Sequence, residues 1–267
     1  MTTTAAAKRR IIAAASAVAA LALLAAPLPS AVASADASAP AAAKTRAAKA
    51  VAKPAAKAPT AAKASAATAA DFTSIFAGQA PALVEAGWAT CSAPITWSVD
   101  TRGLSADEAA AQIANIEWAF GVWSQASGLS FQYAGTTTLS YNDSSFSLKP
   151  ADGSATPSRH VYLAFVADSD SDRMGGGVVG LGSPSTVWPT TKEIVNGTAV
   201  FRTDHIKKSG AREAKALILH ELGHVLGLGH ADDAANIMHG IVTGDTELGA
   251  GDTNGVRTMM KPCAQAA

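Results

Sequence analysis

The chain has 267 residues, with 21 basic and 21 acidic side chains and only two cysteines. The charges are unevenly spread: residues 71–267 hold 12 Lys and Arg against 20 Asp and Glu, a net charge of −8 (12 − 20). Such an acidic region argues against nucleic-acid binding, and no segment after the N-terminal region is apolar enough to cross a membrane.

Residues 1–35 have the pattern of a secretory signal peptide. A basic start, Lys8-Arg9-Arg10, precedes an apolar run at 11–24, and Ala33-Ser34-Ala35 provides a cleavage site of small residues. The alternative is a retained anchor, which the short, alanine-rich run disfavours. We therefore expect a secreted, extracellular protein with no membrane contact after cleavage.

Residues 36–70 consist almost entirely of Ala, Lys, Pro, Ser and Thr, with Asp36 as their one acid. Such a segment has too little apolar bulk to offset the entropy of ordering it, so we expect a disordered linker or a short propeptide. An alanine-rich helix is the alternative, which Pro54 and Pro59 disfavour. The folded part of the chain is then residues 71–267, a suitable size for one domain.

The first elements of this domain are a strand and a long helix. Residues 95–99 are rich in β-branched and aromatic side chains, which favours a strand. Ser105 and Glu108 form a capping-box pattern, so we expect a helix over 105–126, with Gly128 as the residue that stops it. Apolar residues at helical spacing would face its core: Ile113, Ile116, Phe120 and Trp123.

The middle of the domain reads as strands separated by polar loops. We expect strands at 130–133 and 161–166, the second central because it is apolar on both faces, and a loop over 134–159. A short strand is predicted at 178–181. Asn196-Gly197, between apolar residues 194–195 and 199–201, is typical of a hairpin turn.

Two further helices are predicted near the C-terminus, at 211–226 and 252–260, the first stopped by Gly227. The first carries the most informative segment, which runs from His220 to His230. Residues four apart on a helix share a face, so His220 and His224 can aim at one point. Gly227 can adopt a left-handed conformation that turns the chain and brings His230 round as a third ligand.

Three neutral imidazoles leave one tetrahedral position open, which is the arrangement of a catalytic zinc. Glu221 follows the first ligand directly, where it can act as the general base without binding the metal. The alternative, an amphipathic helix with incidental histidines, requires this spacing to arise by chance.

The segment resembles the extended zinc signature of the metzincins, H-E-x-x-H-x-x-G-x-x-H followed by a Met-turn. Asn236-Ile237-Met238 is similar to that turn, and its short distance from His230 resembles the matrixin branch. Further similarity to a matrixin catalytic domain runs from about residue 91 to residue 263. It is carried by the segments 95–99, 119–124, 129–131 and 251–256.

The resemblance implies an α+β fold of the zincin, metzincin-like class. This is a twisted mixed β-sheet with two long helices, a zinc cleft, and a small C-terminal subdomain after Gly227 that contains the Met-turn. It implies that strand 178–181 is the sheet edge that pairs with substrate. Met238 would form an apolar floor beneath the ligands, and residues 231–242 would line the specificity pocket. The second, structural zinc of matrixins is not expected, because 168–182 contains no histidine.

Asp168, Asp170 and Asp172 alternate in a loop whose matrixin counterpart binds calcium, and closely spaced carboxylates suit that ion. The alternative is a solvated acidic loop. The other histidines have no partner at ligand spacing and are interpreted as surface or packing residues: His160, His205 and His239.

Cys91 and Cys263 stand near the two ends of the domain, and export to an oxidising compartment favours a disulfide between them. The rival is a free Cys91 thiolate that caps the zinc and keeps the enzyme latent.

We expect a monomeric zinc endopeptidase that acts on proteins or peptides. Two alternatives are a zinc hydrolase of cell-wall peptide cross-links and a non-catalytic wall-associated protein. The intact Glu221 argues against the second alternative, because a binding module needs no base.

Overall fold

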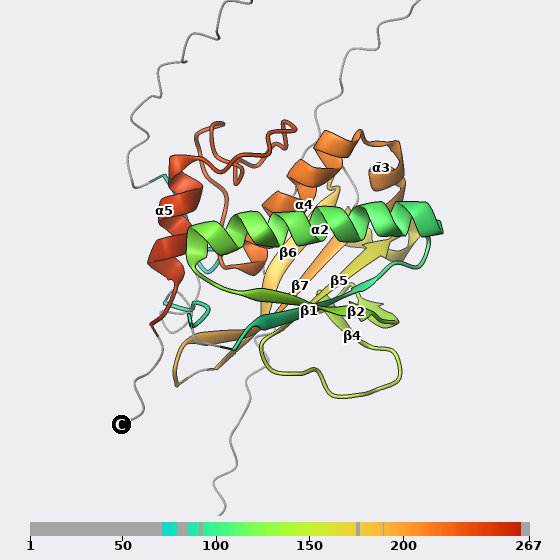
Figure 1. Ribbon diagram of the computed structural model, residues 1–267, viewed down its shortest axis with the longest axis horizontal. Helices are drawn as coiled ribbons and strands as arrows, with labels where there is room; N and C mark the ends of the chain where they lie inside the picture. The colour runs from blue at the N-terminus through green and yellow to red at the C-terminus, as the bar shows by residue number, and fades with distance from the viewer. Residues whose placement is uncertain (1–70, 79–84, 91–92, 175–176, 189, 263–267) are drawn as a thin grey trace, which may run out of the picture. The chain divides into compact units, whose positions relative to one another are not determined.

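A mixed sheet of five strands, in the order β2-β1-β5-β7-β6, forms the framework of the domain (Figure 1). The computed structural model describes residues 71–78, 85–90, 93–174, 177–188 and 190–262. Strands β2, β1, β5 and β7 run parallel, and β6 is antiparallel to β7 at the edge. The strands are Ile95–Asp100 (β1), Phe131–Thr136 (β2), His160–Val166 (β5), Gly180–Trp188 (β6) and Glu193–Arg202 (β7). The predicted mixed sheet is confirmed.

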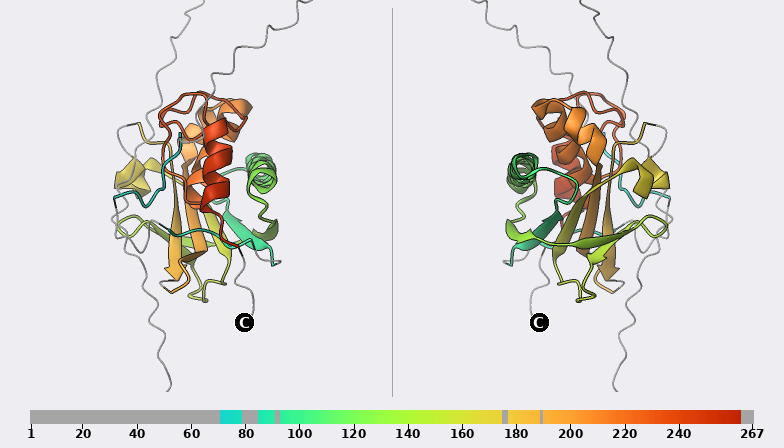
Figure 2. Two further views of the ribbon diagram at one scale, coloured as in Figure 1. Left: turned by 90° about the vertical axis from the view of Figure 1, so that its left-hand side faces the viewer. Right: turned by 90° about the vertical axis from the view of Figure 1, so that its right-hand side faces the viewer.

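Helices α2 (Ala106–Ser127) and α4 (Ala211–Val225) pack on the same side of the sheet (Figure 1). The capping box that begins α2 is present: the Glu108 N–H donates to Ser105 Oγ at 3.3 Å, and the Ser105 N–H donates to Glu108 Oε2 at 2.7 Å. Gly128 ends α2 in the left-handed region, with φ of +75°. Two shorter helices complete the set, α3 (Thr203–Lys208) and α5 (Ala250–Met259). The Arg257 Nε–H donates to Ala126 O at 3.1 Å, which ties α5 to the end of α2 (Figure 2).

The core has two parts, one on each face of the sheet. Alternate residues of the fully buried strand β5 supply both parts, as its central place in the sheet requires. Val161, Leu163 and Phe165 face the helices, whereas Tyr162, Ala164 and Val166 face the opposite side. The aromatic centre of the helix side includes Trp97 and Trp123, which are 1% and 0% exposed.

The stretch 134–159 is not a simple loop, as its polar composition had suggested. Strand β2 continues to Thr136, and an antiparallel pair follows, β3 (Leu139–Asn142) and β4 (Ser147–Pro150). Leu139 and Leu148 are buried in the second core, whereas Ser140 and Lys149, which follow them, are exposed. The polar residues that suggested a loop are therefore the solvent side of a two-stranded sheet covering one face. Short 3-10 turns at Asp168–Asp170 and Asp172–Met174 lie on the same side.

The hairpin predicted at Asn196-Gly197 is wrong, because both residues lie inside the single strand β7. The glycine is needed for packing rather than for a turn: a Cβ there would lie 2.5 Å from Val225 Cγ1 of α4. Asn196 donates a side-chain hydrogen bond to Pro157 O at 2.7 Å. The Asn196-Gly197 pair, which is typical of a turn, is therefore explained here by the close contact between α4 and β7.

Two other expectations, on the sheet edge and on the C-terminal subdomain, have mixed outcomes. Strand β6 lies at the sheet edge, as expected, but it begins at Gly180 rather than at residue 178 and continues to Trp188. The small C-terminal subdomain is not confirmed as a separate unit, because Met238 and Val256 belong to the same core as the helices and the sheet.

None of the helices in the described part of the chain has the length and apolar character needed to cross a bilayer. Cys91 and Cys263 both lie outside the described residues.

Candidate metal centre

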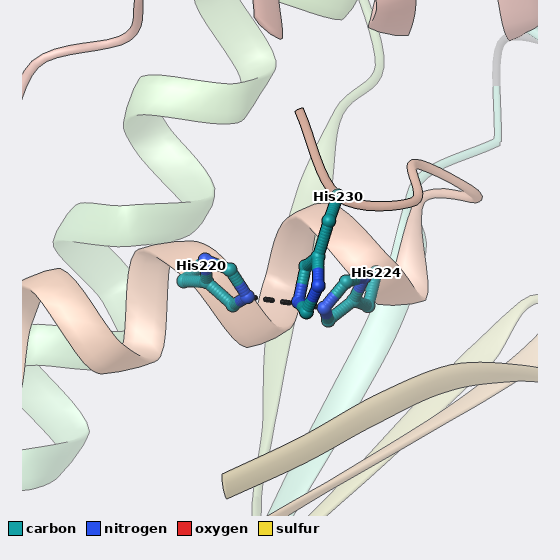
Figure 3. Close-up of side chains that lie close together, drawn as sticks. All are labelled: His220, His224 and His230. Carbon is teal, nitrogen blue, oxygen red and sulfur yellow. Dashed lines mark hydrogen bonds between the residues drawn. The ribbon is translucent and has the colours of Figure 1, made fainter. Parts of the chain in front are cut away.

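Helix α4 and the segment that follows it bring His220, His224 and His230 together (Figure 3). One ring nitrogen from each histidine lies within 4.8 Å of the others, and the Nε2 atoms of His220 and His224 are 3.0 Å apart. His220 and His224 stand one turn apart on the same face of α4, as their spacing predicts. Among the described residues, this is the only group of three or more His, Cys, Asp or Glu side chains with metal-ligand geometry.

Gly227 makes the turn that returns His230 to the helix. Its φ is +107°, a conformation that costs glycine little. The Gly227 N–H donates to His224 O at 2.9 Å, and the Leu228 N–H donates to Gly223 O at 3.0 Å. These bonds satisfy carbonyls at the end of α4 while the chain changes direction. The positive φ agrees with the role expected from the sequence.

Two of the three rings are oriented by backbone carbonyls. His220 Nδ1 lies 2.6 Å from Ile237 O, and His224 Nδ1 lies 2.7 Å from Leu228 O. A carbonyl oxygen only accepts, so both Nδ1 atoms carry the proton and donate it. Each neutral ring therefore turns an unprotonated Nε2 toward the same point.

The histidine cluster fits a cation. Burial lowers the pKa of all three histidines, to about 3 for His224 and to about 4 for His230, so the rings are neutral at pH 7. The Nε2 of His230 is buried without a hydrogen-bond partner in the described part of the chain. Converging lone pairs without donors are unfavourable unless a positive charge lies between them. Three neutral imidazoles are a zinc donor set that leaves one position open.

Glu221 is buried beside this cluster, with a relative exposure of 1%. Neither carboxylate oxygen has a hydrogen-bond partner among the described residues, and burial raises the pKa of Glu221 well above its ordinary value. Its carboxyl group lies against the backbone of β6: a Cβ at Gly180 would be 2.7 Å from Glu221 Oε1. A buried carboxyl group with free lone pairs is suited to accepting a proton.

The turn at residues 236–238 supports the cluster from the side of α5. Met238 is buried, and its side chain packs against the backbone of Gly223. Asp252 of α5, 1% exposed, accepts hydrogen bonds from the backbone N–H groups of Ile237 at 2.6 Å and Met238 at 3.1 Å. Burial raises the pKa of this carboxyl, and the backbone bonds oppose that effect. Asp252 therefore holds in place the turn whose carbonyl orients His220.

The acidic loop does not form a comparable centre. Asp168, Asp170 and Asp172 are exposed and do not gather into a metal-ligand group in the part of the chain that the structure describes. Asp168 Oδ1 instead forms an ion pair with Arg202 Nε at 2.9 Å. The structure gives no support for calcium.

The remaining histidines are not part of this three-histidine group. His160 is buried, with Nδ1 2.7 Å from Thr96 Oγ1, and therefore acts as a packing residue. His205 Nε2 lies 3.6 Å from Glu213 Oε1 near the surface, and His239 lies next to the Met238 turn, partly exposed.

Sequence reasoning missed several residues that shape the centre. The carbonyls of Leu228 and Ile237 have no side-chain signature, so nothing in the sequence could reveal their role. Gly180 lies in the predicted strand 178–181 and Gly182 directly follows it, and a glycine in a strand signals close backbone approach. Asp252 contributed only to a family resemblance, and its bonds to the turn depend on tertiary contact.

The comparisons with known proteins agree with this geometry. A search of curated proteins gives no match. A family model described as matrixin matches residues 87–261, a span that includes all five strands of the sheet, the three histidines and Glu221. Since this match covers well over half of the sequence, the chain belongs to the matrixin family of zinc-dependent metalloproteases.

Proposed function

We propose that the protein is a secreted zinc endopeptidase in which His220, His224 and His230 hold the metal and Glu221 is the general base. The observation that carries this proposal is the buried, unpartnered Glu221 carboxyl beside three neutral rings whose bare nitrogens converge. The charged start, apolar run and small-residue site within residues 1–35 support export. The substrates would be proteins or peptides, and we propose that the enzyme acts as a monomer.

Zinc held by three imidazoles supplies Lewis acidity, which lowers the pKa of a water to about 7 and polarises a carbonyl. Positive charge at the cluster favours the ionised form of Glu221, which opposes the effect of burial on its pKa. The Glu221 carboxylate then takes the proton of the water that attacks the scissile carbonyl carbon. The same carboxyl group gives this proton to the departing amine, so no proton is gained or lost overall.

The open edge of β6 is the proposed support for the substrate backbone. Strand β6 pairs only with β7 within the described sheet, and Gly180 and Gly182 place it directly against Glu221 of α4. A peptide that adds to this edge as a strand would have its scissile bond held at a reproducible distance from the cluster.

Two substitutions separate metal binding from proton transfer. Glu221→Gln should retain one equivalent of zinc, because Glu221 is not a ligand, and should lose roughly 10²–10⁴ in kcat/KM on a peptide substrate. His224→Ala should lose both zinc and activity. Zinc is measured by metal analysis of the purified protein after gel filtration. Near-normal proteolysis by zinc-loaded Glu221→Gln would contradict the assignment of the base.

A further inference from the structure

Among the three histidines, His230 is held in a different way. The rings of His220 and His224 each donate from Nδ1 to a backbone carbonyl, whereas the His230 ring makes no hydrogen bond within the described residues. It packs against the backbone of Gly240, where a Cβ would lie 3.1 Å from its Nδ1. The position of this ring therefore depends on where the backbone of residues 227–233 is placed.

Residues 71–76, here called the N-terminal strap, lie along that backbone. Ser74 forms an antiparallel bridge with Leu228. The Ile75 N–H donates to Gly227 O at 2.9 Å, and the Gly229 N–H donates to Thr73 O at 2.7 Å. The strap thus extends the segment between α4 and His230 as a short paired strand.

Two side chains of the strap reach the third ligand and the residues after it. The Thr73 hydroxyl donates to the backbone carbonyl of His230 itself at 2.8 Å. The Asp71 carboxylate accepts from the backbone N–H of Asp232 at 3.2 Å and of Asp233 at 3.1 Å, and from Asn236 Nδ2 at 2.6 Å. Asp71 therefore joins the segment after His230 to the turn that orients His220.

The strap is itself anchored in the core. Phe76 is 2% exposed, and Phe72 packs against α5, where a Cβ at Gly255 would lie 2.7 Å from its ring. Gly229 and Gly251 both leave room for the strap, because a Cβ at either position would overlap its atoms. These contacts restrict the strap to one path, so its hydrogen bonds can position the ligand segment.

We infer that Thr73 and Asp71 are positioning residues for the third metal ligand, so that the strap determines how tightly the cluster holds zinc. The inference rests on the proposed zinc site. Apart from the strap, residues 227–233 are held by the two bonds at the end of α4, by the His224 ring, which donates to Leu228 O, and by the Ala231 N–H, which donates to Met238 O at 2.9 Å. Two local bonds also reach Asp233, from the backbone N–H groups of residues 235 and 236. The strap supplies five hydrogen bonds to the same segment, on both sides of His230.

The test uses the full chain and measures the zinc dissociation constant by competition with a chelator. Thr73→Val removes the hydroxyl and keeps the β-branched shape, and Thr73→Ser restores the donor. Thr90→Val is the matched control, because Thr90 Oγ1 also donates to a backbone carbonyl from an exposed site, that of Lys261 at 3.2 Å. Asp71→Ala removes the second support. Unfolding of the metal-free proteins is followed in parallel by circular dichroism.

We expect Thr73→Val to raise the zinc dissociation constant about three- to tenfold and Asp71→Ala about tenfold or more, in the range found for residues that orient metal ligands. Thr73→Ser and Thr90→Val should bind zinc like the unaltered protein. Equal affinity in Thr73→Val and the unaltered protein would overturn the inference, as would equal losses in Thr73→Val and Thr90→Val. An unaltered protein that binds no zinc would instead overturn the proposed function, and this inference with it.

Discussion

At the scale of single residues, glycines in the sheet determine how closely helix α4 can pack against it. Positions Gly180, Gly182 and Gly197 all face α4, and a Cβ at any of them would overlap atoms of Glu221 or Val225. The helix that carries two of the histidines therefore packs directly on the backbone of β6 and β7. This contact also places the Glu221 carboxyl against the strand proposed to bind substrate.

The close contact at Gly180 leads to a prediction for catalysis. Gly180→Ala would put a methyl group 2.7 Å from Glu221 Oε1, so the carboxyl group has to move. Because a displacement of about 1 Å in a catalytic group costs on the order of 10²-fold in rate, we expect kcat/KM to fall at least tenfold with zinc content unchanged. Gly121→Ala is the control, since a Cβ at this α2 position meets nothing within 4 Å. Unchanged kcat/KM in Gly180→Ala would show that Glu221 is not confined by β6.

The buried His160 leads to a prediction of how the free energy of unfolding changes with pH. Burial lowers its pKa from 6.5 to about 4, and its contacts are the Thr96 hydroxyl and the Tyr162 ring. Between these two values the unfolded chain binds a proton that the folded protein does not. Above pH 6.5 His160 is neutral in both states and does not change the free energy of unfolding. As the pH falls from 6.5 toward 4, protonation of the unfolded chain lowers that free energy.

The measurement is urea unfolding of the metal-free protein between pH 7 and pH 5. One proton contributes a slope of at most about 1.4 kcal/mol per pH unit. His160→Asn should show a shallower loss of unfolding free energy toward acid than the unaltered protein. The other buried histidines are present in both proteins, so the difference isolates His160. Identical slopes would contradict the prediction.

At the scale of elements, the centre depends on pieces of chain that are distant in sequence. Helix α4 carries His220 and His224, the turn at 236–238 orients the first of them, and α5 holds that turn through Asp252. The N-terminal strap reaches the same region from the other end of the domain. Loss of one such support should therefore affect both stability and metal binding.

Asp252→Asn tests this dependence. Asp252 accepts from three backbone N–H groups, including that of Gly249 at 2.7 Å, and an amide would turn a donor toward some of them. An unsatisfied buried polar group costs about 1–3 kcal/mol, so we expect a loss of about 2–4 kcal/mol in the free energy of unfolding. Asp152→Asn, at an exposed aspartate that accepts from the Ser154 N–H at 2.9 Å, should change it by less than about 0.5 kcal/mol. Equal effects of the two substitutions in urea unfolding would refute the role of Asp252.

At the scale of the whole molecule, the two ends of the domain meet. Ala89 and Lys261 form a parallel bridge, the Lys261 N–H donates to Trp88 O at 2.9 Å, and the Thr90 N–H donates to Lys261 O at 2.9 Å. Thr90, which directly precedes Cys91 in the sequence, is thus hydrogen-bonded to Lys261, which stands two residues before Cys263.

We therefore predict a bond between Cys91 and Cys263, which would close a loop of 172 residues (263 − 91). In the ideal chain-entropy model, a loop of that length stabilises the fold by about 4–5 kcal/mol. Intact-mass analysis after alkylation under denaturing, non-reducing conditions should show no alkylated thiol. Two alkylated thiols would eliminate the disulfide and favour the rival, a free Cys91.

Much of the fold could be predicted from sequence wherever local rules decided it. The capping box at Ser105 and Gly128 bounded α2, and the doubly apolar strand at 161–166 proved central in the sheet. The spacing of His220, His224 and His230, with a glycine at 227, was enough to predict that three rings converge. In each case a helical or strand periodicity, or a backbone conformation that favours glycine, can be recognised directly in the sequence.

Only the tertiary structure decided the remaining features, because they arise from contacts between distant segments. Gly197 looks like a turn residue until α4 is packed against β7, and residues 134–159 look like loop until Leu139 and Leu148 face the second core. Three sets of hydrogen bonds are of this kind. They are the bonds from His220 and His224 to backbone carbonyls, the bonds that Asp252 accepts from the turn at 236–238, and the bonds of Thr73 and Asp71. No local sequence pattern indicates that the segments they join lie close together. The sequence alone thus identified the side chains suited to hold a metal. The fold supplies the backbone that aims them, since a backbone carbonyl or N–H is the same in every residue and acquires its role only by position.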